Sequence, residues 1–249
     1  MHLEVFAEGR SIFHSFDPRV KIIVFLFFVS LCIAAKGLLV PFLYLITGIV
    51  FLILAKLEFK KVLNRLIPAN GFLLFFWVFV PFMYKSNPYI IETAYFKVSL
   101  EGVHQALIIT LKCNAILMAT IALLGTSNVF ALAHAMLHFK VPAKLVTVFF
   151  VFYRYITVLH EEYLKIKRAA LARGFVPKND LKTYKTYGYL VASLLVKSFE
   201  RSEEVYRAML ARGFKGFFPV LNHFFLKTSD LVFAFFSIAV IFLIYFFNL

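Results

Sequence analysis

Two eight-residue segments of the chain are nearly identical, and both carry arginines suited to binding a carboxylate. The segment RAALARGF at residues 168–175 recurs as RAMLARGF at residues 207–214, so that seven of eight positions match. The arginine guanidinium offers a rigid fork of donors that fits a carboxylate, and the small alanines permit close approach to a partner. We therefore interpret the repeat as two similar docking sites for a partner present in two related copies. The candidate residues are Ala172, Arg173, Gly174, Ala211, Arg212 and Gly213.

A helix cap is the simpler interpretation of either segment alone. Glycine adopts the left-handed conformation that ends many helices, and an arginine in the last turn complements the helix dipole. Capping needs the glycine and tolerates many other residues around it, so it does not require Ala-Arg-Gly-Phe twice. The repetition therefore favours docking.

Three other side chains have types or positions that could carry chemistry. His134 and His138 are four residues apart, so both could face one metal ion, but no glutamate lies between them as in H-E-x-x-H and no third ligand is evident. We therefore expect no metal site and no cofactor. Lys112 lies inside an apolar run. Either it is a functional intramembrane lysine, or its helix begins further along and the side chain reaches the interface.

Enzymatic motifs are absent from the apolar runs of the sequence. They contain no Walker A loop, glycine-rich nucleotide loop, nucleophile elbow or pair of carboxylates. We therefore expect the chain not to be an enzyme, and any ATP hydrolysis to belong to partner subunits.

The elements that must position these residues are helices in a membrane. The chain is 62% hydrophobic with a mean hydropathy of +0.84, well above a soluble domain. A helix crosses with about 20 apolar residues, and no alternating pattern of a barrel is present. The net charge of +14 comes from basic residues that flank apolar runs, which indicates lipid headgroups rather than nucleic acid. The six apolar runs are 20–35, 38–55, 71–84, 105–124, 141–158 and 231–247.

The charges between the runs predict the topology. The loop at 56–65 and the stretch 160–230, with thirteen Lys and Arg against seven Asp and Glu, should both be cytoplasmic. Each crossing moves the chain to the other side of the membrane, so both segments are cytoplasmic only if one of the apolar runs between them does not cross. We expect that run to be 141–158, because it contains Arg154, which is costly at mid-bilayer. We therefore expect an all-α polytopic protein with about five transmembrane helices and an external C-terminus.

Two amphipathic helices are expected on the cytoplasmic side. One covers 141–173 along the interface, and the other covers about 190–212. Glu161 with Lys165 and Glu203 with Arg207 have the spacing of intrahelical ion pairs. The predicted organisation is transmembrane helices at 1–124, coupling helices with both motifs at 125–230, and a last transmembrane helix at 231–249.

Paired Ala-Arg-Gly tripeptides on two cytoplasmic amphipathic helices resemble the T component of energy-coupling factor (ECF) transporters, CbiQ-type. Residues 17–21, DPRVK, resemble the family's N-terminal signature, and residues 126–142 resemble the segment leading into its coupling helices. The resemblance implies a multi-pass cell-membrane subunit whose two tripeptides dock into two ABC-type ATPase subunits. It also implies a substrate-binding membrane subunit, the S component, and import of a micronutrient, either cobalt or nickel ion or a vitamin. The sequence does not identify which.

Two other classes of membrane protein are alternatives to this interpretation. A conventional ABC permease would form the substrate pathway itself and would couple through a different short helix, usually as a pair of permease chains. An intramembrane enzyme would need convergent acids, bases or metal ligands on spanning helices, which the sequence lacks. The ECF transporter subunit is therefore the favoured interpretation.

Overall fold

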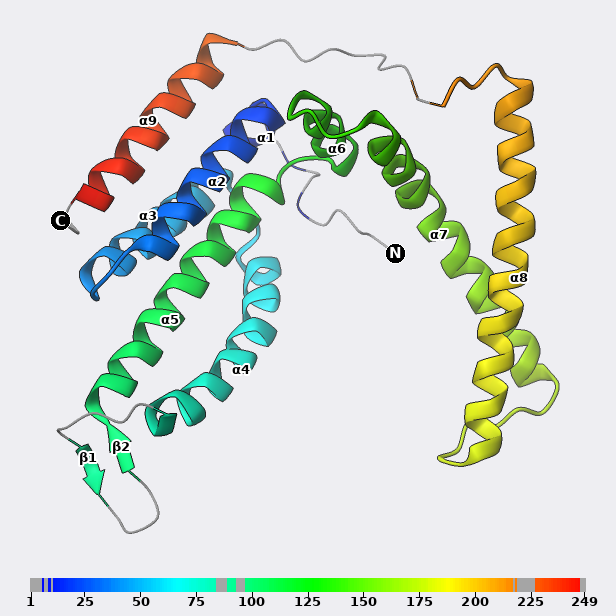
Figure 1. Cartoon of the computed structure of the whole chain (residues 1–249), viewed down its shortest axis with the longest axis horizontal. Helices are drawn as coiled ribbons and strands as arrows, with labels where there is room; N and C mark the ends of the chain where they lie inside the picture. The colour runs from blue at the N-terminus through cyan, green and yellow to red at the C-terminus, as the bar shows by residue number, and fades with distance from the viewer. Residues whose placement is uncertain are drawn as a thin grey trace. The chain divides into compact units, whose positions relative to one another are not determined.

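The fold of the chain is almost entirely helical, as predicted (Figure 1). The structure is a computed structural model that describes residues 6, 9, 11–83, 89–92, 97–216, 218 and 227–246. In the described residues, one antiparallel pair of short strands, β1 (Tyr89–Glu92) and β2 (Lys97–Ser99), accompanies the helices. The helices are α1 (Ile12–Ser15), α2 (Pro18–Ala34), α3 (Leu39–Ala55), α4 (Phe59–Met83), α5 (Leu100–Ala119), the π-helix η1 (Thr120–Leu124), α6 (Val129–His138), α7 (Ala143–Ala172), α8 (Leu181–Ala211) and α9 (Thr228–Phe246).

The chain divides into two compact units. The core unit comprises His2–Ala135 and His223–Leu249, and the hairpin unit comprises Met136–Asn222. The chain therefore leaves the core unit within α6 and returns to it ahead of α9. Each unit is described by itself below.

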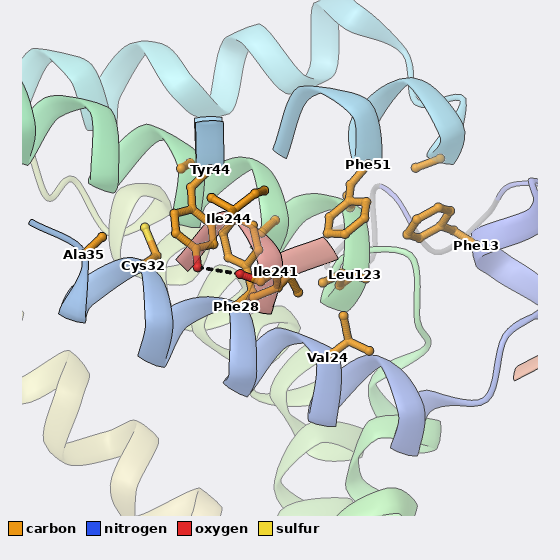
Figure 2. Close-up of a cluster of buried hydrophobic side chains, with 14 of the residues drawn as sticks. Phe13, Val24, Phe28, Cys32, Ala35, Tyr44, Phe51, Leu123, Ile241 and Ile244 are labelled. Atoms are coloured by element: carbon orange, nitrogen blue, oxygen red, sulfur yellow. Dashed lines mark hydrogen bonds between the residues drawn. The ribbon is translucent and has the colours of Figure 1, made fainter. Parts of the chain in front are cut away.

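The hydrophobic centre of the core unit is formed by α2, α3, α5, η1 and α9 (Figure 2). Tyr44 of α3 is fully buried, lies edge-on to the Phe28 ring of α2 with centroids 5.3 Å apart, and donates to the Ile241 carbonyl oxygen of α9 at 3.0 Å. Small residues bring α3 and α5 together, since a Cβ added at Gly48 would lie 3.1 Å from the Ala115 carbonyl oxygen. Close packing over small residues is the usual way for helices to associate in lipid.

The third apolar run belongs to a longer helix than the run itself. The run 71–84 is short for a span, but α4 has 25 residues because it begins at Phe59 and continues through Pro68. Amide groups join it to α5: Asn70 and Asn114 donate to each other's Oδ1 atoms at 3.0 and 2.9 Å. The flanking residues thus supply the length that the apolar run lacks.

Among the residues that the structure describes, four helices are long and apolar enough to cross a membrane. They are Phe59–Met83, Leu100–Leu124, Ala143–Ala172 and Thr228–Phe246. The helices α2 and α3 have 17 residues each, about the lower limit for a span. Length and composition place α7 among the four, whereas we predicted that it lies along the interface. That prediction continues to rest on Arg154 and on the charge of the loops.

The hairpin unit consists of the long helices α7 and α8, which run in opposite directions and cross (Figure 1). Lys197 Nζ lies 2.6 Å from Glu162 Oε1, which fixes one point of contact between the two helices. The first helix matches the predicted range of 141–173 closely. The second begins at Leu181 rather than near 190, because Asp180 caps it by accepting from the Thr183 backbone N–H at 2.7 Å. Hydrogen bonding from Thr183 holds the pKa of this carboxyl below its ordinary value.

The two predicted intrahelical ion pairs have different outcomes. Arg207 Nη2 lies 3.1 Å from Glu203 Oε2, so this pair is confirmed. The prediction for Glu161 was wrong, since Lys165 lies 3.7 Å from Glu162 instead. Glu162 lies on the side of α7 that faces Lys197 of α8, so its carboxylate forms ion pairs with both Lys197 and Lys165.

Candidate functional site

The first copy of the repeat ends α7 in a Schellman motif. Gly174 has a φ of +82°, in the left-handed region, where a side chain would be strained. Its N–H donates to the Leu171 carbonyl at 3.0 Å, and the Phe175 N–H donates to the Ala170 carbonyl at 3.1 Å. These two bonds are the pair that defines the motif.

The second copy ends α8 in the same way. Gly213 has a φ of +79°. Its N–H donates to the Leu210 carbonyl at 2.9 Å, and the Phe214 N–H donates to the Met209 carbonyl at 3.0 Å. The sequence repeat is therefore a repeat of backbone structure.

Capping explains the glycine of each copy. The apolar contact of a Schellman motif joins the residue after the glycine to the last turn of the same helix, whereas the ring contacts of both phenylalanines lie outside that turn. The Phe175 ring lies edge-on to Tyr187 with centroids 5.7 Å apart, and the Phe214 ring lies 5.1 Å from Phe218. The arginine and the alanine before the glycine remain to be explained.

The two arginines of each copy differ in what they contact. The first arginine bonds within its own helix: Arg168 Nε donates to the Leu164 carbonyl at 3.3 Å, and Arg207 pairs with Glu203. The second arginine, Arg173 or Arg212, is the C-cap residue, is exposed, and has no side-chain hydrogen bond or ion pair with any residue that the structure describes. Its whole guanidinium fork is thus available to a partner.

All six candidate residues are exposed, and the space beside both glycines is open. A partner surface can therefore reach the backbone at each helix end, with the arginine beside it and only a small alanine side chain preceding it. A positive side chain at a helix C-terminus also lies in the favourable field of the helix dipole. Each end is suited to a surface that offers a carboxylate.

The two helix ends lie far apart on the hairpin unit. The contact between Glu162 and Lys197 is ten residues before Ala172 and fourteen before Ala211. Since the helices run in opposite directions and each residue adds 1.5 Å, the two ends lie on opposite sides of the crossing, up to roughly 36 Å apart. The two ends are therefore separate places on the hairpin unit.

Lys112 contacts the end of a neighbouring helix. The idea that its helix begins further along is wrong, because α5 begins at Leu100. Lys112 Nζ donates to the carbonyl oxygens of Ile33 and Ala35 at 2.8 and 2.6 Å. These carbonyls end α2, so the ammonium serves as a C-terminal cap supplied by another helix.

The two histidines lie on α6. His134 is buried and His138 is exposed. Within the described part of the chain, no three His, Cys, Asp or Glu side chains come together in a group that could hold a metal ion. Neither histidine is part of the helix ends described above.

Sequence reasoning missed a buried polar cluster in the core unit. Lys21 of α2 lies beside Thr126 and Ser127, more than one hundred residues away in the chain, and near Asp17 and Asp230. In the sequence, residues 17–21 carry only the resemblance to the family's N-terminal signature. The only local sign in the sequence is that charged residues stand at the start of two otherwise apolar helices.

Comparisons with known proteins agree with these features. The family model CbiQ, described as cobalt transport protein, matches residues 9–224. The "Energy-coupling factor transporter transmembrane protein EcfT" of Bacillus subtilis is 28% identical over 221 residues, covering 85% of this chain and 83% of the relative. The proteins of the same name from Lactococcus lactis and Streptococcus equi are 29% and 24% identical, again over 85% of this chain and over 83% and 82% of the relatives. The chain therefore belongs to the CbiQ family, the transmembrane T components of ECF transporters.

Proposed function

We propose that this chain couples two ABC-type ATPase subunits to a substrate-binding membrane subunit, and so drives the import of a micronutrient. The observation that carries the proposal is the pair of nearly identical helix ends, each with an exposed arginine that has no intramolecular ion partner among the described residues. Two similar ends call for two similar receptors, and a pair of ATPase subunits would supply them.

The hairpin unit suits the transmission of force. Its helices have 30 and 31 residues, and they contact each other through Glu162 and Lys197 at a point between the two ends. A movement of the ATPase subunits that changes the distance between their receptor sites would tilt one helix against the other. The chain itself would be non-enzymatic, with hydrolysis carried out by the partners.

The apolar side chains of the hairpin helices provide a surface for the substrate-binding subunit. The predicted apolar face of α8 is largely exposed in the isolated chain: Phe199, Tyr206 and Leu210 are 66%, 53% and 49% exposed. On α7, Leu145, Val148 and Phe152 are 61%, 65% and 57% exposed. Lipid and an apolar membrane subunit are the surroundings that suit such faces.

The transported micronutrient would be bound by the partner subunit. Cobalt or nickel ion and vitamins remain the candidate substrates, since the family model is described as cobalt transport protein and the described residues include no group suited to hold a metal ion.

The test is co-expression of the chain with its ATPase and membrane partners, followed by native mass spectrometry of the purified complex. We expect two ATPase subunits, one copy of this chain and one small membrane subunit, with ATP-driven uptake in vesicles only when all are present. Two copies of this chain with two ATPase subunits and no further membrane subunit would instead indicate a conventional ABC permease, and would overturn the proposal.

A further inference from the structure

A cluster of charged and polar side chains is buried where α2 begins. Lys21 is 1% exposed, and its Nζ donates to Ser127 Oγ at 2.8 Å and to Thr126 Oγ1 at 3.4 Å. Asp17 and Asp230 are 6% and 2% exposed. All five side chains line one cavity of about 340 Å³ in the core unit.

The two carboxylates of this cluster have unused acceptors. Asp17 Oδ1 accepts from the Arg19 N–H at 2.9 Å, and Asp230 Oδ2 accepts from the Lys227 N–H at 3.0 Å. The other oxygen of each is buried and has no hydrogen-bond partner among the described residues. Both carboxylates line the same cavity as the Lys21 ammonium, whose positive charge offsets part of their negative charge.

Stability alone is a weak reason for such a cluster. Buried ion pairs replaced by apolar side chains of similar size often leave a protein equally stable, whereas removal of one partner leaves a charge uncompensated. Buried charges are best attested as devices that fix one arrangement of elements against the alternatives. A role in fixing the arrangement of particular helices would therefore explain the cluster better than stability does.

All members of the cluster belong to the core unit, and they flank in sequence both connections to the hairpin unit. Thr126 and Ser127 follow the π-helix η1 and precede α6, within which the chain leaves the core unit. Asp230 lies in the first turn of α9, the helix that follows the return to the core unit. From the first turn of α2, Lys21 donates hydrogen bonds to the residues before α6 and lines the same cavity as Asp230 of α9.

We propose that Lys21, with Asp17 and Asp230, anchors both connections of the hairpin unit, so that movement of the hairpin helices is passed to the transmembrane helices. These are positioning residues for coupling, and the inference rests on the proposed function. Without the anchor the hairpin helices would still bind their partners, but the core unit would no longer follow them.

The test compares Lys21→Met with Lys112→Met. Both changes remove an ammonium that donates two hydrogen bonds within the core unit, but Lys112 caps α2 and touches neither connection. Ser127→Ala is a milder second variant, in case Lys21→Met does not fold. Spin labels are placed at the exposed positions Phe59 and Lys185, one on each unit, after both native cysteines are replaced by alanine. Distances are measured in the complex with its ATPases, with and without ATP and vanadate.

We expect wild type and Lys112→Met to show a narrow distance distribution that shifts with nucleotide. In Lys21→Met the distance distribution should be about twice as broad as in wild type, and its shift with nucleotide should be less than about half of the wild-type shift. This is the behaviour of a two-state element released from its restraint. Ser127→Ala should show a smaller change of the same sign. The ATPases should co-purify at the wild-type ratio in every variant. An unchanged shift in a folded Lys21→Met or in Ser127→Ala, or an equal loss in Lys112→Met, would overturn the anchor and leave the proposed function standing. Failure of the ATPases to co-purify with wild type would overturn the proposed function itself.

Discussion

Removing the arginine at each helix end tests whether the repeat is more than a pair of caps. In the isolated chain the Arg173 and Arg212 side chains make no hydrogen bond or ion pair with the described residues, so each Arg→Ala change should remove only a dipole contribution of about 0.3–1 kcal/mol. In a complex, each change would leave a partner carboxylate buried and unpaired, which costs about 2–5 kcal/mol. That range corresponds to roughly 30-fold to 4,000-fold weaker binding per site.

The chain contains its own matched controls for this experiment. Arg168 and Arg207 belong to the same repeated segments, and each is bonded within its own helix. We expect Arg168→Ala and Arg207→Ala to leave ATPase binding within a few-fold of wild type, because a solvent-exposed intrahelical contact is worth about 0.5 kcal/mol.

The assay is titration of the detergent-purified chain with the ATPase pair, combined with thermal unfolding of the chain alone. Arg173→Ala and Arg212→Ala should each weaken binding at nearly unchanged unfolding temperature, and the double variant should abolish uptake. Arg→Lys should restore binding only in part, because lysine lacks the bidentate fork. If the double variant binds its ATPases and supports uptake like wild type, or if the two control variants lose as much, the repeat is a pair of caps and the docking argument fails.

Three further predictions concern topology, the cap and metal binding. A reporter fused after Lys215 should be cytoplasmic and one after Leu249 external; a cytoplasmic reporter at the C-terminus would refute the five-span topology. Gly213→Ala should destabilise the end of α8 by about 1–2 kcal/mol, because the left-handed conformation is unfavourable for alanine; hydrogen exchange at Phe214 should rise, and no rise would contradict the strain argument. Calorimetry should detect no micromolar binding of cobalt or nickel to the chain alone, and binding that His134→Ala abolishes would show the prediction to be wrong.

Hydropathy and charge predicted most of the helices but not all of their boundaries. The runs of α2, α3 and α9 match their helices within three residues at each end, because apolar residues cover most of their length. The start of α5 at Leu100 lies five residues before the predicted run, because residues 101–105 are mixed in polarity. The start of α4 was missed because residues 59–70 are mixed in polarity and include Pro68. The start of α8 was missed because residues 181–189 are mostly polar or aromatic and include Gly188, and helix formation there depends on the Asp180 cap.

The two similar helix ends could be recognised from the sequence because a repeat is a local property, and their role in docking stays a prediction. The buried cluster was not predicted from the sequence. Lys21 and Ser127 are 106 residues apart in the chain, and local sequence patterns do not indicate contacts over such a separation. Lys112 is an intermediate example. Its position in an apolar run made it an unusual residue, but its acceptors are two backbone carbonyl oxygens, which cannot be identified from residue types.

The crossing of α7 and α8 has a consequence for symmetry. Two similar helices that run in opposite directions and touch near Glu162 and Lys197 are related approximately by a local two-fold axis through that contact. The repeated segments lie on opposite sides of this contact, ten and fourteen residues from it, so the relation between them is approximate by about one helical turn. A single asymmetric polypeptide thus presents a pseudosymmetric ligand. If the two ATPase subunits of the proposed complex offer two equivalent sites, one copy of this chain would occupy both sites and would exclude a second copy.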